Sequence, residues 1–168
     1  MAERICFSRL REDAVVPSKR PEDAGYDIYA CLETDFIKLE PLETRLIPTG
    51  IASACSPGYY FQLFERGSTG TRGIAQRCGV IDSGYRGEWF IPLTNLNRSP
   101  LYFARESMRE TLSTQAESGK LLVYFTSRAI AQAVLLPVPE TEVVELPYDE
   151  LMKLASARGS GRLGSSGK

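Results

Sequence analysis

Midway along the chain the sequence reads Gly79-Val80-Ile81-Asp82-Ser83-Gly84-Tyr85-Arg86-Gly87. Two apolar β-branched residues followed by an acid and a Ser-Gly pair are typical of a β-strand that runs into a tight turn. Residues 88–93 supply a returning strand, so the stretch predicts a β-hairpin with an acid at its tip. We therefore expect a fold built from short strands and turns around this hairpin.

The tip of the expected hairpin carries two side chains suited to a ligand. An aspartate can accept a proton from water, which makes Asp82 a candidate general base. The ring of Tyr85 can pack against a ligand. An aspartate that opens a turn also commonly hydrogen-bonds its own backbone, and on this stretch alone that structural interpretation is the better one.

Composition limits the class of protein. The 168 residues are 43% hydrophobic and 24% charged, which is ordinary for one globular domain with a sizeable core. The net charge of -1 gives neither a basic field for nucleic acid nor a polybasic patch for a membrane surface. Because the sequence shows no apolar run near the length of a membrane span and no leader-like segment, we expect a cytoplasmic protein without nucleic-acid or membrane partners.

Histidine is absent from the sequence. Its absence excludes Ser/His and Cys/His nucleophiles, histidine acid–base catalysis and histidine zinc ligation. Catalysis would then depend on carboxylates, cationic side chains, hydroxyls or a metal ion that arrives with a substrate. The cysteines are widely spaced without a Cys-x-x-Cys pair and are interpreted as buried thiols: Cys6, Cys31, Cys55 and Cys78.

Short strands punctuated by Pro and Gly are expected on both sides of the hairpin, at residues 5–10, 44–50, 58–64 and 121–125, with a turn and a buried strand over 127–136. Repeated short strands of this kind predict an all-β sandwich or barrel. Residues 95–119, rich in Arg, Glu and Ser, are expected to form a surface excursion with helical composition over 104–118. A short helix is expected within residues 147–155.

Three further stretches have compositions that suit phosphate or metal. Ala24-Gly25-Tyr26-Asp27-Ile28-Tyr29-Ala30 offers Asp27 to a metal-bound water, although an edge-strand aspartate facing solvent explains it equally well. Residues 65–73 combine glycines, hydroxyls and two arginines, which suit a polyanion but are also common in ordinary turns. Residues 158–168 have the composition of a linker, and equally that of a tail that orders around a triphosphate.

Five separated stretches stand in the order of one family's motifs. They are residues 24–30, Arg66-Gly67-Ser68-Thr69-Gly70, residues 79–87, Ile130-Ala131-Gln132 and residues 158–167. Over essentially its whole length the chain resembles trimeric deoxyuridine triphosphatase (dUTP diphosphatase, or dUTPase). The third and fifth stretches are the most specific, whereas the second and fourth would mean little alone.

The resemblance implies a fold and a reaction. The fold would be an all-β jelly-roll-like sandwich, assembled as a homotrimer with active sites shared at subunit boundaries. A β domain over residues 1–157 would be followed by a flexible C-terminal arm, residues 158–168, that closes over the site. The reaction would be hydrolysis of dUTP to dUMP and pyrophosphate with Mg²⁺, so the implied partners are dUTP and other copies of the chain.

The resemblance also assigns roles to residues. Asp82 would deprotonate the water that attacks the α-phosphorus, Tyr85 would pack against the deoxyribose where a 2′-hydroxyl would clash, and Asp27 would reach hydrated Mg²⁺ through water. Phosphates would meet Arg66, Ser68 and Gln132, and the arm would add Arg158, Ser165 and Ser166. The remaining substrate-binding positions are Gly67, Gln76, Gly79, Leu163 and Gly164.

The chain departs from the family pattern in four motifs. Gly67 stands where Ser usually follows Arg66, so the sequence leaves open which hydroxyl of this motif contacts phosphate and whether Ser68 takes the usual role. Gly84 stands where an Asp is common, which leaves Asp82 as the acid there. Ser127-Arg128-Ala129 replaces Gly-Asp-Arg, so an expected ion pair is missing or rebuilt. Leu163 replaces a Phe and would cover uracil by apolar contact without ring stacking.

Two alternative functions compete with dUTP hydrolysis. The related dCTP deaminase shares the fold but uses a glutamate on the returning strand, where this chain has Pro92, which cannot exchange a proton. The second alternative is a non-catalytic member that uses the nucleotide site for binding or regulation. Such a protein has no need of a positioned base, so cleavage of dUTP and its loss in Asp82→Asn would separate the two.

Overall fold

The computed structural model describes residues 3–161, which divide after Val138 into two compact units. The division comes earlier than the boundary expected at residue 157. It does so because the described residues beyond Val138 are exposed, with Val143 95% exposed. Within the second unit, Tyr148–Leu151 forms the short helix α3 that was expected there. No helix among residues 3–161 is long and apolar enough to cross a membrane.

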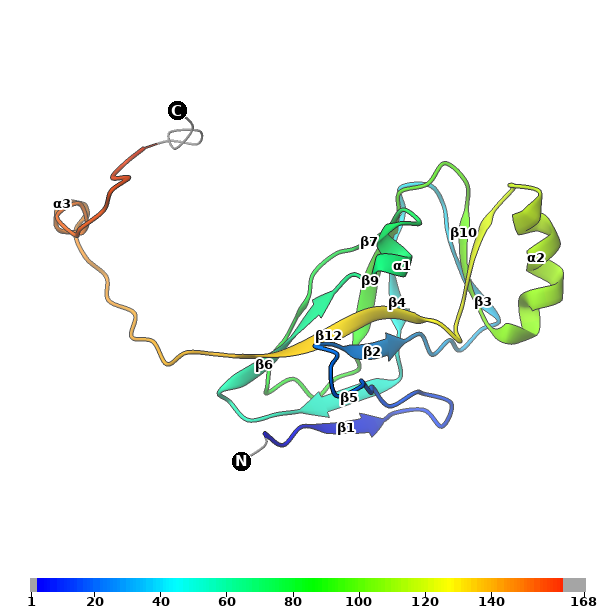
Figure 1. Cartoon of the computed structure of the whole chain (residues 1–168), viewed down its shortest axis with the longest axis horizontal. Helices are drawn as coiled ribbons and strands as arrows, with labels where there is room; N and C mark the ends of the chain where they lie inside the picture. Colours follow the sequence, from blue (N-terminus) through cyan, green and yellow to red (C-terminus); the bar gives the residue numbers. More distant parts are fainter. Residues whose placement is uncertain (1–2, 162–168) are drawn as a thin grey trace. The chain divides into compact units, whose positions relative to one another are not determined.

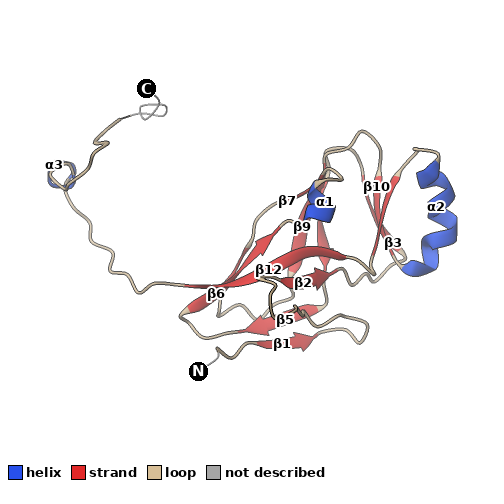
Figure 2. Cartoon of the chain, viewed as in Figure 1, coloured by secondary structure: helices blue, strands red, loops and turns tan. Residues whose placement is uncertain are grey.

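The first unit consists mainly of short β-strands, as the sequence predicts (Figures 1 and 2). The strands are β1 Cys6–Arg9, β2 Tyr26–Tyr29, β3 Phe36–Leu39, β4 Thr44–Pro48, β5 Ile51–Ala54, β6 Tyr59–Phe64, β7 Ile74–Gln76, β8 Val80–Ile81, β9 Phe90–Asn95, β10 Leu101–Ala104, β11 Leu122–Phe125 and β12 Ala129–Pro137. Its helices are α1 Gly67–Gly70 and α2 Arg109–Glu117, the latter preceded by a 3₁₀ turn at Glu106–Met108.

The described strands pair into four small sheets, with the strand orders β1-β5, β11-β10-β3, β2-β12-β6-β8 and β4-β9-β7. A buried cluster draws residues from the three larger sheets, including Phe61 on β6, Ile91 on β9 and Phe103 on β10. Trp89 lies at its centre, with its ring 5.1 Å from that of Phe61 and 5.8 Å from that of Phe7. The sheets therefore pack around a shared core, and the all-β prediction is confirmed.

Strand β12 lies between β2 and β6 and is antiparallel to both. Its buried positions are alanines and isoleucine, which let the neighbouring strands pack closely against the core. The register places Gln132 of β12 opposite Asp27 of β2 on one side and opposite Phe64 of β6 on the other. Three stretches that are far apart in the sequence are thereby brought together at one end of the sheet (Figure 1).

The prediction of a β-hairpin over residues 79–93 is wrong in one respect. The tight turn is present, with the amide of Tyr85 donating to the carbonyl of Asp82 at 3.0 Å. The two flanking strands, however, belong to different sheets, because β8 pairs with β6 while β9 pairs with β4 and β7. The chain passes from one sheet to the other at Trp89. The Trp89 side chain is buried, and its backbone amide donates a hydrogen bond to the Ile51 carbonyl, which holds this point of the chain against β5.

The expected surface excursion over residues 95–119 begins with a buried strand. Asn95 and Phe103 are fully buried, and β10 joins β3 and β11 in the core. The strand was not predicted because the four-residue run Leu101-Tyr102-Phe103-Ala104 is short and lies within a stretch rich in charged residues. Helix α2 lies within the expected helical segment, where Leu112 packs against Phe125.

The cysteines are not uniformly buried. Cys31 is buried and Cys55 half-buried, whereas Cys6 and Cys78 are exposed. The expectation of buried thiols is therefore wrong for those two residues. All four are free thiols in the described structure.

Candidate active site

Three of the sequence-predicted site residues meet beside the start of α1. The Asp27 carboxylate lies 3.0 Å from the Arg66 guanidinium, and both side chains are about one-third exposed. The Gln132 amide donates to the carbonyl of Glu65 at 3.2 Å, which ties β12 to the segment that carries Arg66. Because strand register fixes Asp27 and Gln132 side by side, this convergence follows from the sheet itself.

The loop before β2 closes over these residues. Ser18 pairs with Asp27 in an isolated β-bridge, and the Asp27 amide donates to the Ser18 carbonyl at 2.9 Å. The Arg20 guanidinium lies 2.9 Å from the Asp23 carboxylate, and the Lys19 ammonium donates to the Asp23 carbonyl at 2.6 Å. These contacts fold the loop back on itself and tie it to the backbone of β2 at Asp27.

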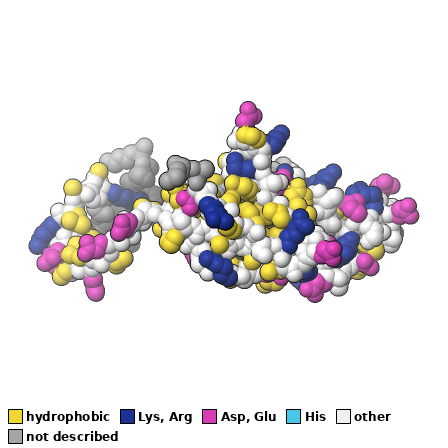
Figure 3. All heavy atoms as spheres, turned by 90° about the horizontal axis from the view of Figure 1, so that it is seen from below, with side chains coloured by type: hydrophobic (Ala, Val, Ile, Leu, Met, Phe, Trp, Pro, Cys, Tyr) yellow, Lys and Arg dark blue, Asp and Glu magenta, His cyan; other side chains and the backbone are white. Residues whose placement is uncertain are grey.

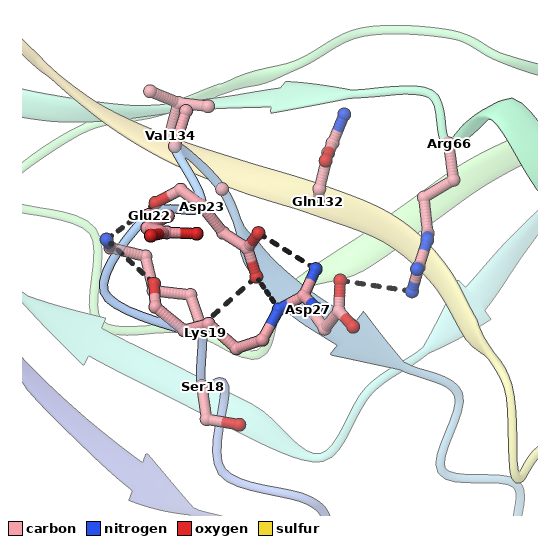
Figure 4. A pocket seen from close by; sticks show the side chains of 11 residues that line it. Ser18, Lys19, Glu22, Asp23, Asp27, Arg66, Gln132 and Val134 are labelled. Carbon is pink, nitrogen blue, oxygen red and sulfur yellow. Dashed lines mark hydrogen bonds and ion pairs between the residues drawn. The ribbon is translucent and has the colours of Figure 1, made fainter.

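Between this loop and β12 lies a cavity of about 730 Å³, here called the loop cavity (Figure 4). Figure 4 shows the Arg66 side chain directed toward Asp27 across its rim. A side chain at Gly25 would place its Cβ 3.1 Å from the Cβ of Gln132, so glycine keeps this side open. Besides Asp27, Arg66 and Gln132, its lining includes Ser18, Lys19, Arg20, Glu22 and Asp23.

A second cavity, about 330 Å³ in volume, lies on the other side of the Asp27–Arg66 pair and is here called the Ser68 cavity. The hydroxyl of Ser68 lies 3.2 Å from that of Tyr124 on β11. Its lining also includes Ser127 and Arg128 from the turn between β11 and β12. The hydroxyl of Ser68 thus lies at this cavity. The space beside Gly67 is open, because a Cβ there would meet nothing within 4 Å.

Asp82 and Tyr85 lie apart from these two cavities and line neither of them. Asp82 is exposed on the turn, and the Tyr85 hydroxyl donates to the Glu88 carbonyl at 2.9 Å. The Arg86 guanidinium donates to the carbonyls of Ser53 and Ser83, which fastens the turn to β5. Within one copy of the chain, the candidate base is therefore well held but separate from Asp27.

Gly79 and Gln76 lie next to this turn. A Cβ at Gly79 would stand 2.6 Å from the Gln62 amide nitrogen and 2.9 Å from the Leu63 carbonyl oxygen, so only glycine fits there. The Gln76 amide nitrogen donates to the Cys78 carbonyl at 3.2 Å, and its amide oxygen is buried without a hydrogen-bond partner among the described residues. Gln76 thus braces the backbone that leads into the turn.

The C-terminal candidates are described only in part. Arg158 belongs to the second unit, where its guanidinium donates to the Gly161 carbonyl at 3.2 Å. Leu163, Gly164, Ser165 and Ser166 lie outside the described residues. Their assigned contacts with substrate remain predictions.

The unusual Ser127-Arg128-Ala129 stretch has a rebuilt set of contacts. The Ser127 hydroxyl donates to the Glu106 carboxylate, which also accepts from the Arg109 guanidinium at 2.8 Å. The Ser127 hydrogen bond, followed by Arg109, holds the pKa of Glu106 below its usual value. The turn is thus anchored to the segment before α2 rather than by an acid of its own.

Pro92, at the position where a deaminase would need a glutamate, lies buried in β9. Its carbonyl accepts from the Arg77 amide at 2.9 Å. The residue is therefore part of the sheet and brings no titratable group to the turn.

Sequence reasoning missed the contribution of residues 18–23 to the site. The signal was a pair of cations, Lys19 and Arg20, followed across Pro21 by a pair of acids, Glu22 and Asp23, immediately before the Asp27 stretch. Opposite charges three positions apart in a loop can fold it back on itself, as Arg20 and Asp23 do. Tyr124 was missed because it lies in an apolar run, residues 121–125, where a tyrosine is expected to pack in the core.

Comparisons with known proteins identify the family of the chain. The dUTPase family model matches residues 11–106. A deoxyuridine 5′-triphosphate nucleotidohydrolase of Wolbachia pipientis is 35% identical over 150 residues, covering 88% of this chain and 82% of the relative.

Two solved structures share the fold. The dUTPase of Staphylococcus bacteriophage 80alpha with dUpNHpp superposes with a TM-score of 0.73 at 23% identity, covering 98% of this chain and 99% of that one. A mutant dUTPase from phage phi11 of S. aureus, described as revealing the coordination of a structural Mg(II) ion, has a TM-score of 0.66 at 20% identity, covering 85% of this chain and 96% of that one.

Proposed function

This chain belongs to the dUTPase family, and from that premise we propose that it hydrolyses dUTP to dUMP and pyrophosphate. The observation that carries the proposal is the convergence of Asp27, Arg66 and Gln132, which come from three separated stretches and meet at one end of a sheet. An acid, a guanidinium and an amide at one place suit a phosphate chain and its counterion.

Asp82 acts as the general base in this proposal. Its carboxylate takes a proton from water as the water oxygen forms a bond to the α-phosphorus, and the bond from that phosphorus to the bridging oxygen breaks. Pyrophosphate leaves with the electron pair of that bond. The exposed position of Asp82 on a braced turn supports this role, since the base must reach a substrate held elsewhere.

Cations and hydroxyls around the Asp27–Arg66 pair stabilise the charge of the phosphate chain. Catalysis of this kind depends on alignment and charge neutralisation and needs no histidine. Arg66, Ser68 and Gln132 hold the phosphates, with Gly67 leaving room for them.

Mg²⁺ is the cofactor that the site fits. No group of three or more His, Cys, Asp or Glu side chains among residues 3–161 could hold a metal alone. Mg²⁺ keeps several waters and is commonly bound by one or two carboxylates together with substrate phosphates. Asp27, partly exposed at the rim of both cavities, fits that single-carboxylate role through water. The ion would supply charge neutralisation on the phosphate oxygens.

A homotrimer with shared sites completes the proposal. Asp82 and Tyr85 line neither cavity that contains Asp27, so a second copy must bring its turn to them. Large apolar side chains also stay exposed on the first unit, including Leu46 on β4 and Phe90 on β9, and Figure 3 shows apolar side chains gathered on one face. Exposed apolar patches are common where another protein binds.

Tyr85 and the neighbouring backbone select the nucleoside. The Tyr85 ring, fixed by its bond to Glu88, packs against the deoxyribose, and the main chain at Gly79 reads uracil with Gln76 behind it. Residues 158–168, with Arg158, Leu163, Gly164, Ser165 and Ser166, form the arm that covers the bound nucleotide.

Mixing two inactive variants tests the shared site. Asp82→Asn removes the base, and Arg66→Gln removes a phosphate contact, so each homotrimer should be strongly impaired. In randomly mixed trimers about a quarter of the sites combine an intact turn with an intact cavity. Co-refolding should therefore restore pyrophosphate release, whereas mixtures that stay as inactive as their parents would show that each copy works alone.

Product analysis tests the reaction itself. Pyrophosphate release is measured from dUTP, dCTP, dTTP and UTP side by side with Mg²⁺, together with ammonia. We expect pyrophosphate from dUTP alone. Ammonia from dCTP would support the deaminase instead, and no product from any nucleotide would favour a binding module.

A further inference from the structure

Arg128 is an exposed cation that the assignments above leave without a role. Its backbone is fixed, because its amide donates to the Phe125 carbonyl at 3.0 Å in the turn between β11 and β12. The preceding residues anchor the turn, with the Thr126 amide bound to the Ala104 carbonyl at 2.9 Å and the Ser127 hydroxyl bound to Glu106. An exposed side chain thus extends from a hydrogen-bonded turn at the Ser68 cavity.

The acids near Arg128 already have partners. Asp27, across the Ser68 cavity, pairs with Arg66 at 3.0 Å. Glu106, on the other side of the turn, accepts from Ser127 and Arg109. Among the described residues, no ion pair or side-chain hydrogen bond engages the Arg128 guanidinium.

The charge balance differs between the two cavities. The loop cavity is lined by three cations (Lys19, Arg20 and Arg66) and three acids (Glu22, Asp23 and Asp27), so it is formally neutral. The Ser68 cavity has Arg66 and Arg128 against Asp27 alone, with the hydroxyls of Ser68, Ser127 and Tyr124 around them. The Ser127 and Tyr124 hydroxyls already donate to Glu106 and to the Ala129 carbonyl, so the excess positive charge and the Ser68 hydroxyl are what suit a polyphosphate here.

We propose that Arg128 is a phosphate-binding residue that holds the β- and γ-phosphates of the nucleotide in the Ser68 cavity. This inference rests on the proposed function, in which the α-phosphate must meet the water activated by Asp82. Arg128 lines the same cavity as Arg66 and Ser68, which that proposal places on the phosphates, and the water activated by Asp82 reaches the α-phosphate from the turn of a second copy. A guanidinium suits this role because its planar fork binds phosphate oxygens in pairs.

The test compares Arg128→Gln with Arg98→Gln, which makes the same charge change at another exposed arginine. Arg98 lies between β9 and β10 and lines neither cavity. We expect Arg128→Gln to raise the KM for dUTP about tenfold with a smaller change in kcat, while Arg98→Gln stays near the wild type. Arg128→Lys should recover part of the loss, since it keeps the charge but not the fork.

Ligand binding separates a phosphate contact from a structural effect. Arg128→Gln should weaken binding of non-hydrolysable α,β-imido-dUTP about tenfold and leave binding of dUMP unchanged, because dUMP lacks the distal phosphates. Equal loss for both ligands, or no loss for either, would overturn the assignment. A wild-type protein that does not cleave dUTP would instead defeat the proposed function, so the two failures are distinguishable.

Discussion

The Asp27 carboxylate lies 3.0 Å from the Arg66 guanidinium, and this pair joins strand β2 to the start of helix α1. Both side chains are about one-third exposed, so solvent screens their attraction and the pair contributes little to stability. The pair lies between the two cavities, and this position matters more for the proposed binding of phosphates than the attraction between the two charges does for stability. In the proposed complex, the carboxylate would reach the Mg²⁺ ion through water, and the guanidinium would contact the phosphates.

Asp27→Asn should weaken the response to Mg²⁺. We expect the Mg²⁺ concentration for half-maximal turnover of dUTP to rise about tenfold, because the carboxylate that reaches the hydrated ion is gone. Metal-free binding of the nucleotide should be unchanged or tighter, since Arg66 is released toward the phosphates. Asp23→Asn is the matched control, because Asp23 lines the loop cavity but pairs with Arg20. An unaltered Mg²⁺ titration for Asp27→Asn would remove Asp27 from the metal site.

Tyr85→Ala should relax discrimination against UTP. The ring is held by the bond from its hydroxyl to the Glu88 carbonyl and lies over Gly87, where a Cβ would come 2.5 Å from the hydroxyl oxygen. Removing the ring opens the space that a 2′-hydroxyl needs, so the ratio of kcat/KM for dUTP to that for UTP should fall about tenfold. Tyr85→Phe keeps the ring and should keep most of the selectivity; the same selectivity in Tyr85→Ala would place the discrimination elsewhere.

Gly79→Ala should destabilise the protein by about 1–3 kcal/mol, because the new methyl group would overlap the Leu63 carbonyl oxygen and the Gln62 amide. Gly84→Ala, in the turn that follows β8, meets nothing within 4 Å and serves as the control. Denaturant titration of both variants measures the difference. Equal stability of the two would mean that the backbone at Gly79 has room to shift.

The stability of the protein should fall at alkaline pH through Cys31. Burial, together with the hydrogen bond from its thiol to Asp13, raises the pKa of Cys31 above its ordinary value of 9.0. The folded state then retains a proton that the unfolded chain gives up, so the free energy of unfolding decreases as the pH rises above about 9. Cys31→Ala should show a flatter slope of unfolding free energy between pH 8 and 10. Parallel slopes for the two proteins would mean that Cys31 titrates alike in both states.

Several strands, and three residues that the structure brings together, could be predicted from the sequence. Alternation at residues 5–10, 44–50 and 58–64 matches β1, β4 and β6, because local patterning is enough to define a half-buried strand. Asp27, Arg66 and Gln132 were identified through their motifs, and their convergence follows from the register of β12 with β2 and β6.

Long-range pairing could not be predicted. Residues 79–93 look like a hairpin because β8, the turn and β9 are contiguous, yet β8 pairs with β6 and β9 with β4. The chain passes from one sheet to the other at the buried Trp89, and local sequence does not reveal where that side chain packs. The contact of Ser127 with Glu106 is equally invisible, since it depends on how the segment before α2 folds back.

Turnover of dUTP by Asp82→Asn tests the central claim most directly. Single-turnover pyrophosphate release should fall by about 10² to 10⁴, because a positioned general base contributes that much. Binding of α,β-imido-dUTP should persist, and Asp35→Asn, at another exposed aspartate, should behave as the wild type. Undiminished pyrophosphate release by Asp82→Asn would contradict the account, because the attacking water would then be activated by another group.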